Sequence, residues 1–468
     1  MGRGVFRFRA RGAERAAILE PKAALFDVAV AEQPELFTAD MELMRQTPPM
    51  SDRDEVIFLL HTAAEIEHSL LAQYLYAAYS LNNTGKQKAW RRTLLEIARE
   101  EMAHLLSVQN VLRVLGGPLN FEREDFPFNV LYPFPFRLEP FTLKSIARYV
   151  LAEMPEPSTI PPELGFDVEQ VKRDAQVSEP SEMVNRVGAL FAKLLELVDK
   201  LIDQAPNKPG DFRPETRPLQ ADSDEGWVIR NMILEVVTNK VEAKALIDRI
   251  GSQGEGPGEP GPEGPSHFRR FFRIYTEIKA SPEQAESRVV PINPTTQEPS
   301  ECGSNPNFIA APLARAWADL FNNRYRILLA DLAHVLTIAR DDKVQPESRT
   351  TILGWIFFEM QKSLAAIAET LATIPRHDPP QFGDAEQRVL IAAGAPFALP
   401  YTLQLPDQPI DRWRQHEQLL AEASLRIAAV QKELGGSNEI LDRMITADQR
   451  SLDFAREQIG NLSKPMDS

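Results

Sequence analysis

Three ionisable side chains with the spacing of metal ligands lie close together in the sequence: Glu67, Glu101 and His104. Glu101 and His104 are three residues apart, so on a helix they lie one turn apart on one face. All three lie among apolar residues that recur at helical spacing, which predicts a core-facing position for each. Burial without a partner costs roughly 2–7 kcal/mol for a polar group and more for a charge. A bound metal ion would compensate that cost, and a hydrogen-bonded cluster without metal is the alternative.

Two helices must carry these residues, and the sequence predicts them from Asp52 to about Asn82 and from Gln87 to Leu115. Ser51 is the expected N-cap of the first helix, and Gly116–Pro118 is a stop signal for the second. A Glu on one helix beside a Glu-x-x-His on its neighbour is one half of a di-metal carboxylate site in a four-helix bundle. Carboxylate and imidazole ligands suit iron, manganese or zinc and do not separate these metals.

Other polar side chains accompany the candidates on the first helix. Tyr74 follows Glu67 by seven residues, two turns along the same face. There it could hydrogen-bond a ligand, act as a redox side chain or simply fill the core. Glu65 and His68 lie on a neighbouring face, where they could orient a ligand or take part in a polar contact between helices.

A di-metal site needs a second set of ligands, and the sequence leaves that set open because no later Glu-x-x-His follows. His267 is the strongest single candidate, since it follows a Gly- and Pro-rich loop, Ser252–Ser266, that must fold back tightly. Asp331 and His334 form a separate option on a later apolar helix. The remaining candidates are all acidic: Glu153, Glu235, Glu242 and Glu255.

Composition excludes several classes of partner. The 468 residues include 52 Lys and Arg against 67 Asp and Glu, a net charge of −15, which argues against sequence-independent binding to nucleic acid or to anionic lipid. Cys302 is the one cysteine, so no intramolecular disulfide can form. No apolar run is long enough for a membrane span, and the N-terminus lacks the apolar core of a signal peptide. The expectation is a cytoplasmic protein with a small-molecule substrate.

The periodicity predicts an all-α protein with long irregular crossovers. Four segments are expected: an N-terminal arm at 1–50, a metal-binding bundle at 51–280, additional helices packed on it at 281–408, and a helical hairpin at 409–468. The hairpin is a candidate surface for a homo-oligomer or a protein partner. An aromatic, proline-rich stretch at 126–136 is expected to be a crossover or to cover the mouth of a site. Further helices are predicted at Thr142–Glu153, Ser181–Asp203, Trp227–Ile250, Leu313–Ile338, Thr350–Ile374, Ile410–Leu434 and Asn438–Ile459, with one more opening at His267.

Several motifs in a fixed order resemble a known family. They are the run Leu60–Leu81, then Ile97–Leu105 with Asn110 and Gly116-Gly-Pro, then Gln253-Gly-Glu-Gly256, Ser266-His-Phe268, Met360–Pro375 and Ala393-Gly-Ala-Pro-Phe397. Together they resemble the ferritin-like domain of the iminophenyl-pyruvate dimer synthase family, over roughly residues 50–400. That family includes a domain of the enzymes that oxidatively couple two indole-pyruvate imines on the way to violacein and rebeccamycin-type pigments.

The resemblance implies a ferritin-like helical bundle with a metal site, most simply di-iron. By motif it assigns ligand roles to Glu67, Glu101 and His104, and further to Glu153, Glu255 and His267. One departure matters, because relatives usually have an acidic residue and a tyrosine where this chain has Ala189 and Phe191. If that acidic residue is a ligand in relatives, the site here is altered, mononuclear or lost. The pigment-forming enzymes are also much longer than this chain.

Three functions follow as hypotheses. The first is a di-iron or mono-metal oxidoreductase of secondary metabolism that acts on an amino-acid-derived imine or a similar small molecule, with Tyr74 as a catalytic candidate. The second is a ferroxidase or peroxide-scavenging protein without an organic substrate, which a site closed to anything larger than oxygen would favour. The third is a metal-free scaffold that retains the bundle.

Overall fold

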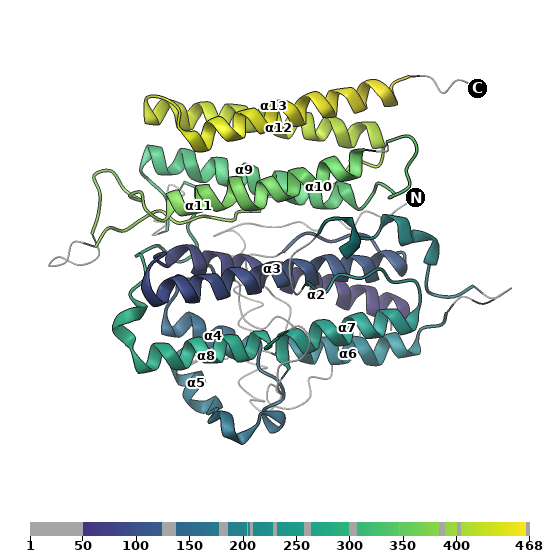
Figure 1. Ribbon diagram of the computed structural model, residues 1–468, viewed down its shortest axis with the longest axis horizontal. Coiled ribbons are helices and arrows are strands. Elements are labelled where there is room, and N and C mark those ends of the chain that lie inside the picture. Colours follow the sequence, from purple (N-terminus) through teal and green to yellow (C-terminus); the bar gives the residue numbers. More distant parts are fainter. Residues whose placement is uncertain are drawn as a thin grey trace, which may run out of the picture.

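The computed structural model describes residues 50–123, 137–176, 186–203, 205, 209–227, 232–256, 264–298, 307–345, 347–382, 389–399 and 404–464. Within these residues the protein is all-helical, with twelve α-helices, α2 to α13, and isolated β-bridges in place of any strand. The all-α prediction is therefore confirmed. The helices form two stacked bundles with the long pair α2 and α3 at their junction (Figure 1). None of the described helices has the length and apolarity to cross a membrane.

The first bundle is organised around α2 (Asp52–Ser80) and α3 (Gly85–Val114), which lie against each other along their length. Four shorter helices complete it: α4 (Leu143–Ala152), α6 (Val187–Lys200), α7 (Lys240–Glu255) and α8 (His267–Ala280). In Figure 1, α8 and α7 lie in line with each other, as do α4 and α6, so two positions of the bundle are each filled by two short helices. Side by side, α4 packs against α8 and α6 against α7. The ends of these short helices therefore meet near the middle of the long pair.

Side-chain caps start several helices. The predicted N-cap Ser51 accepts a hydrogen bond from the backbone N–H of Asp54 at 3.2 Å, as a helix N-terminus requires. Ser266 caps α8 by accepting from the backbone N–H of Arg269 at 3.3 Å. That cap fixes His267 as the first residue of its helix.

The helix predicted at Trp227–Ile250 is wrong in its first half. Residues 232–238 are not helical, and α7 begins only at Lys240. Buried side chains bind the backbone of this extended stretch: Ser107 Oγ donates to the carbonyl of Ile233 at 2.7 Å, and Gln220 exchanges two hydrogen bonds with Val237. Because the main chain is satisfied from outside, it has no need of helical hydrogen bonds. A second difference is α5 (Val168–Ala175), which lies between the predicted helices Thr142–Glu153 and Ser181–Asp203, where no helix was predicted.

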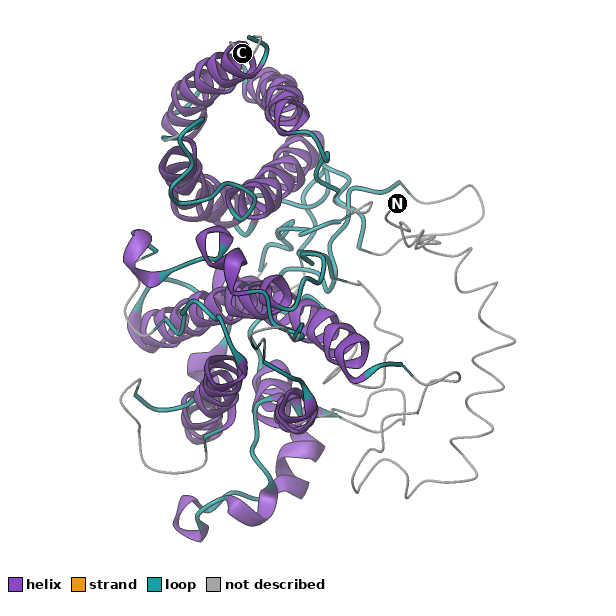
Figure 2. Ribbon diagram, turned by 90° about the vertical axis from the view of Figure 1, so that its right-hand side faces the viewer, coloured by secondary structure: helices purple, strands orange, loops and turns teal. Residues whose placement is uncertain are grey.

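The second bundle contains the rest of the described helices. They are α9 (Pro312–Val335), α10 (Ser348–Phe358), a π-helical segment (Glu359–Leu364), α11 (Ala365–Leu371), α12 (Pro409–Leu434) and α13 (Glu439–Leu462). The segments α10, π and α11 are consecutive and form one continuous helix-like rod. With α9, α12 and α13 this rod makes a bundle that appears as a ring when viewed end-on (Figure 2). The predicted C-terminal hairpin is thus part of a bundle with α9, while the division into four segments stays a prediction.

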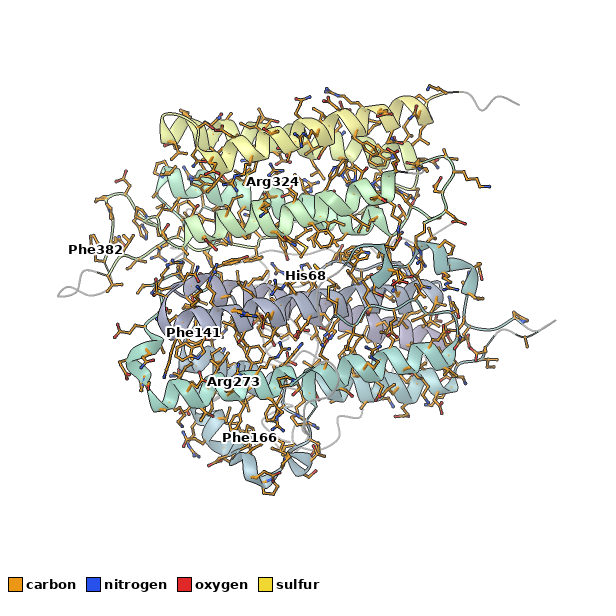
Figure 3. The ribbon with its side chains drawn as sticks, viewed as in Figure 1. His68, Phe141, Phe166, Arg273, Arg324 and Phe382 are labelled. Carbon is orange, nitrogen blue, oxygen red and sulfur yellow. The ribbon has the colours of Figure 1, made fainter. Side chains whose placement is uncertain are left out.

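The two bundles meet through polar side chains. His68 on α2 contacts the hydroxyl of Tyr325 on α9, and Figure 3 shows His68 at this junction. The guanidinium of Arg123 donates to the carbonyl of Phe397. His68 therefore serves the contact between bundles. The arm at 1–49, the aromatic stretch at 126–136, Cys302 and residues 257–263 of the Gly-rich loop lie outside the described residues.

Candidate metal centre

Five helices contribute to one buried polar cluster in the first bundle. Glu67 comes from the middle of α2, and Glu101 and His104 come from the middle of α3. Glu153 is the C-cap of α4, and His267 is the first residue of α8. All five are at most 2% exposed. The fifth helix, α7, supplies Glu255 as its last residue.

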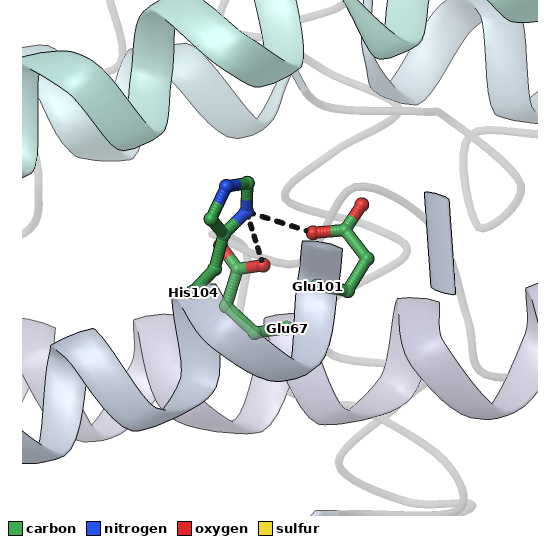
Figure 4. Close-up of side chains that lie close together, drawn as sticks. All are labelled: Glu67, Glu101 and His104. Atoms are coloured by element: carbon green, nitrogen blue, oxygen red, sulfur yellow. Dashed lines mark hydrogen bonds and ion pairs between the residues drawn. The ribbon is translucent and has the colours of Figure 1, made fainter. Parts of the chain in front are cut away.

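The first group of the cluster contains Glu67, Glu101 and His104 (Figure 4). His104 Nδ1 lies 3.0 Å from Glu101 Oε2 and 3.4 Å from Glu67 Oε2. One ligand atom from each residue lies within 4.8 Å of the others, which is the separation that a single bound cation requires.

The second group contains Glu101, Glu153 and His267. His267 Nδ1 lies 2.9 Å from Glu101 Oε1 and 3.7 Å from Glu153 Oε2. Glu101 therefore belongs to both groups, and each of its two oxygens faces a different histidine. A carboxylate in this position can bridge two metal ions.

Outer partners hold each histidine with Nδ1 toward the cluster. His104 Nε2 lies 2.8 Å from the amide oxygen of Gln253, and His267 Nε2 lies 3.0 Å from Glu100 Oε2. Both partner oxygens are acceptors, so the ring proton is on Nε2 and the lone pair is on Nδ1 when the ring is neutral. Histidines that ligate metals are held in this way, through their other ring nitrogen.

Glu100 and Tyr74 complete the outer layer. Arg270 donates to the Glu100 carboxylate, and His267 and Arg270 together hold the pKa of Glu100 below its usual value against the effect of burial. Tyr74 donates its hydroxyl proton to Glu153 Oε1 at 2.5 Å, which leaves Glu153 Oε2 toward His267. Burial, followed by the charge of Glu153, raises the pKa of Tyr74 well above its usual range, so its phenol remains a donor.

Three atoms of the cluster are buried without a hydrogen bond: Glu67 Oε2, Glu101 Oε1 and His267 Nδ1. The last two are 2.9 Å apart but are not aligned for a hydrogen bond. A cavity of about 10 Å³, enough for one water-sized occupant, lies in this cluster, and its polar lining is Glu67, Glu101, His104, Glu153 and Glu255. Unsatisfied carboxylate and imidazole atoms around a small space are the donor set that a transition-metal cation fits.

Glu255 enters the same cavity because glycines make room for it. The backbone N–H of Gly188 on α6 donates to the Glu255 carboxylate, and a Cβ at residue 188 would collide with that carboxylate. A Cβ at Gly254 would lie 3.1 Å from Glu153 Oε2. Burial, followed by the charge of Glu153, raises the pKa of Glu255 well above its usual range.

The junction of α7 and α8 rebuilds a motif that the sequence lacks. Ser266 Oγ donates to the carbonyl of Gly256 at 2.8 Å, so the two ends of the Gly-rich loop touch. With the intervening residues set aside, the order across the junction is Glu255, Gly256, Ser266 and His267. This is a Glu-x-x-His motif interrupted by a loop.

The charges of the cluster are balanced by protons when no metal is present. Burial, followed by the charge of Glu101, raises the pKa of both Glu67 and Glu153. Burial opposes the charge on His104, but the adjacent carboxylates of Glu101 and Glu67 outweigh it and raise the pKa of His104 to about 10. The nearby imidazoles hold the pKa of Glu101 well below its usual range despite burial. Metal binding would release these protons.

Comparison with known proteins agrees with this geometry. A family model described as ferritin-like matches residues 60–276. Residues 60–276 form a ferritin-like domain. The match begins on α2 and ends on α8, so it contains all six residues that the sequence analysis assigned to the cluster.

Two curated proteins are distant homologues of this chain. Dichlorochromopyrrolate synthase from Lentzea aerocolonigenes is 25% identical over 377 residues, which cover 71% of this chain and 35% of that protein. 2-imino-3-(indol-3-yl)propanoate dimerase from Chromobacterium violaceum is 26% identical over 310 residues, which cover 58% of this chain and 28% of that protein. The chain thus spans about a third of the length of these relatives. A solved ferritin-like protein from Caulobacter vibrioides aligns with 65% of this chain and 94% of its own, at 18% identity and a TM-score of 0.40.

Several other candidates lie away from the cluster of the ferritin-like domain. Glu235 pairs with Arg249, and Glu242 accepts hydrogen bonds from Thr238 in the first turn of α7. Glu65 accepts from Asn120 at 3.1 Å. These side chains serve local structure.

The altered position 189 also lies outside the cluster. Ala189 is exposed on α6, so its short side chain removes nothing from the ligand groups, whereas Phe191 lines the cavity. The roles of Glu100, Gln253 and Gly188 were not predicted from the sequence. Gln253 was within a quoted motif, but its contact with His104 depends on how α7 packs on α3.

Proposed function

We propose that this chain is a metal-dependent oxidoreductase whose ferritin-like domain holds two iron ions and oxidises a small imine derived from an amino acid. The proposed ligands are Glu67, Glu101, His104, Glu153, Glu255 and His267. The observation that carries the proposal is the position of Glu101, whose two oxygens lie 3.0 and 2.9 Å from Nδ1 of two different histidines. The same ligand atoms could also bind manganese or zinc, so the identity of the bound metal must be measured.

The residues around the ligands have defined tasks. Gln253 and Glu100 keep Nε2 of the two histidines protonated and leave Nδ1 toward the cluster. Tyr74 holds Glu153 in place and keeps its own proton on the hydroxyl oxygen. Bound iron would supply one-electron chemistry between an oxidant and a substrate, which these side chains cannot perform alone. The apolar surroundings exclude water from the cluster and so strengthen each electrostatic contact.

Support for the substrate class comes from the names of the two relatives. One is a dimerase of a 2-imino acid and the other a chromopyrrolate synthase. Joining two imines through a new carbon–carbon bond removes two electrons and two protons. Dioxygen would take them to become hydrogen peroxide, or hydrogen peroxide would take them to become two waters.

A second function is favoured by the small size of the cavity. At about 10 Å³ it accepts a water-sized molecule, which suits a ferroxidase or peroxide-scavenging centre better than a site for a large organic substrate. In that case iron(II) itself is the substrate, and it delivers its electrons to dioxygen or peroxide.

Metal content separates both proposals from a metal-free scaffold. Purified parent protein and a Glu101→Ala/His104→Ala variant would be loaded with iron(II) without oxygen and analysed by inductively coupled plasma mass spectrometry. We expect bound metal in the parent and its loss in the variant. Absence of metal from both would overturn the metalloprotein proposal.

Turnover then separates the two functions. The iron-loaded parent would be given hydrogen peroxide with and without the imine made from tryptophan by an amino-acid oxidase. Peroxide consumption that requires the imine and yields a dimer supports the oxidoreductase. Peroxide consumption that ignores the imine supports metal handling.

A further inference from the structure

A second buried polar cluster lies in the second bundle, far along the chain from the ferritin-like domain. It surrounds a cavity of about 170 Å³. All four positions of the bundle contribute to the wall, including the π-helical segment. The cavity reaches the surface at α13, where Ala447 is half-buried and Arg450 is exposed. The cavity is therefore not sealed on the α13 side by buried residues alone.

Buried acidic groups outnumber the cations around this cavity. Arg324, which Figure 3 shows inside the bundle, donates to Glu359 at 2.9 Å and makes two hydrogen bonds of 2.7 Å to Asp448. One guanidinium thus faces two carboxylates. A third carboxylate, Asp331, lies 3.2 Å from His416 Nδ1. Three carboxyl groups against one buried guanidinium and one imidazole leave the interior of the site rich in acidic groups, while a second guanidinium, that of Arg450, lies exposed at its mouth.

Several carboxylate oxygens at this cavity lack a hydrogen bond. Asp331 is 0% exposed, and neither of its oxygens accepts one. Glu359 is 4% exposed, and its Oε2 is also without a donor. Both residues line the cavity. Buried acceptors of this kind normally have a partner, so these oxygens indicate a missing donor.

The backbone at Glu359 is unusual as well. Glu359 is the first residue of the π-helical segment between α10 and α11. π-helical turns are rare and occur frequently at functional sites. Here the turn coincides with the carboxylate that lacks a donor.

The rest of the wall is apolar and aromatic. Trp355, Phe358, Leu419 and Leu420 face the same space. An apolar cavity of about 150 Å³ can hold benzene. The cavity volume and its apolar lining therefore suit a ligand whose apolar part is about the size of one aromatic ring. The adjacent carboxylates suit a cationic group on that ligand.

We propose that this cavity binds a small primary ammonium ion with an apolar body of about the size of benzylamine. An ammonium group offers three N–H donors, which can satisfy the oxygens of Asp331 and Glu359 together. A metal ion fits less well, because the two groups of convergent ligand atoms among the described residues both lie in the first bundle.

Isothermal titration calorimetry of the full chain tests the proposal with benzylamine as the probe and benzyl alcohol as its neutral analogue. We expect saturable benzylamine binding, with benzyl alcohol about tenfold weaker or worse, because a charge-assisted hydrogen bond is stronger than a neutral one. Asp331→Asn and Glu359→Gln should each weaken benzylamine binding about tenfold or more. Glu417→Gln is the control, since Glu417 lies on the outer face of α12 and pairs with Arg456.

Two further variants keep the test independent of folding and of the metal centre. Leu420→Phe adds volume to the cavity without removing a charge, and it should also weaken benzylamine binding. Glu101→Ala/His104→Ala should leave that binding unchanged. The proposal is overturned by absent benzylamine binding at millimolar concentration, by equal binding of benzyl alcohol, or by full binding in both carboxylate variants. Divalent metal retained by Glu101→Ala/His104→Ala and lost with Asp331→Asn would overturn it in favour of a metal site.

Discussion

Glu101 contacts both histidines of the candidate metal centre, one through each carboxylate oxygen. Of these two histidines, Glu67 lies against His104 and Glu153 against His267. The six proposed ligands are therefore unequal. Removing Glu101 takes one proposed ligand from each of the two groups, whereas removing Glu67 leaves the second group complete.

The first prediction uses this difference. Glu101→Ala should abolish iron binding, while Glu67→Ala should retain about half of the parent's iron, because ligand number sets metal affinity. Mass spectrometry of iron-loaded proteins measures both. Equal losses in the two variants would contradict a bridging role for Glu101.

The second prediction concerns the pH dependence of stability. Burial raises the pKa of Glu359 to about 7 from its ordinary value of 4.5. A carboxyl group with a raised pKa stabilises the fold fully below its unfolded pKa, and that contribution is lost as pH rises toward 7. Glu359→Gln cannot ionise, so its free energy of unfolding should increase relative to that of the parent as pH rises from about 4.5 to about 7, by up to about 1.4 kcal/mol per pH unit.

Urea unfolding of both proteins at several pH values measures this shift. Other titrating groups are common to the two proteins and cancel in the difference. A difference that stays constant with pH would show that Glu359 is ionised in the folded protein throughout.

In the first bundle, the ends of short helices place candidate ligands near the centre. Glu153 is the C-cap of α4, Glu255 ends α7 and His267 begins α8. If these residues lay on one continuous helix, the helix pitch would fix their positions relative to each other. Broken helices can place them independently, at the cost of a tight fit where the ends meet, as at Gly188.

The third prediction tests that fit. Gly188→Ala should displace the Glu255 carboxylate and lower metal affinity while the helices persist, because the added Cβ would collide with that carboxylate. Gly460→Ala is the control, since a Cβ there meets open space on α13. It should be neutral or stabilise by up to about 1 kcal/mol. Circular dichroism and metal content distinguish the two effects, and an unchanged metal content in Gly188→Ala would remove Glu255 from the ligand set.

The whole molecule combines two bundles with separate polar centres. The first has its convergent Glu and His groups, and the second has the buried contacts of Arg324 with Glu359 and Asp448. The bundles touch through His68 and Tyr325, neither of which lines the cavity of its own bundle. Each centre should therefore respond to its own substitutions.

The fourth prediction follows from that separation. Arg324→Met leaves two carboxylates buried without their cation and should destabilise the protein by about 3–5 kcal/mol. Arg426→Met, which removes a half-exposed pair with Glu422, should cost less than about 1 kcal/mol. Urea unfolding compares them. Metal content should equal that of the parent in both, and a loss of metal in Arg324→Met would show that the two bundles are coupled.

The sequence by itself determined the all-α class and the local part of the candidate site. Helical periodicity and capping residues are local signals, so α2, α3 and the cap at Ser51 could be predicted closely. Glu101 and His104 share a helix face through spacing alone. The hydrogen bonds to Ile233 and Val237 come from residues distant in the chain, and local signals do not report them. The predicted start of α7 was therefore wrong.

Only the tertiary structure decided which distant residues meet. Glu255 and His267 are separated by a loop in the chain, and only the contact between Ser266 and Gly256 brings the two helix ends together. The sequence offered Asp331 and His334 as a possible ligand pair on one helix, and only the packing of α9 against α12 brings Asp331 within 3.2 Å of His416. The reason is physical: spacing along one helix follows from its pitch, whereas contacts between helices depend on how whole apolar faces pack.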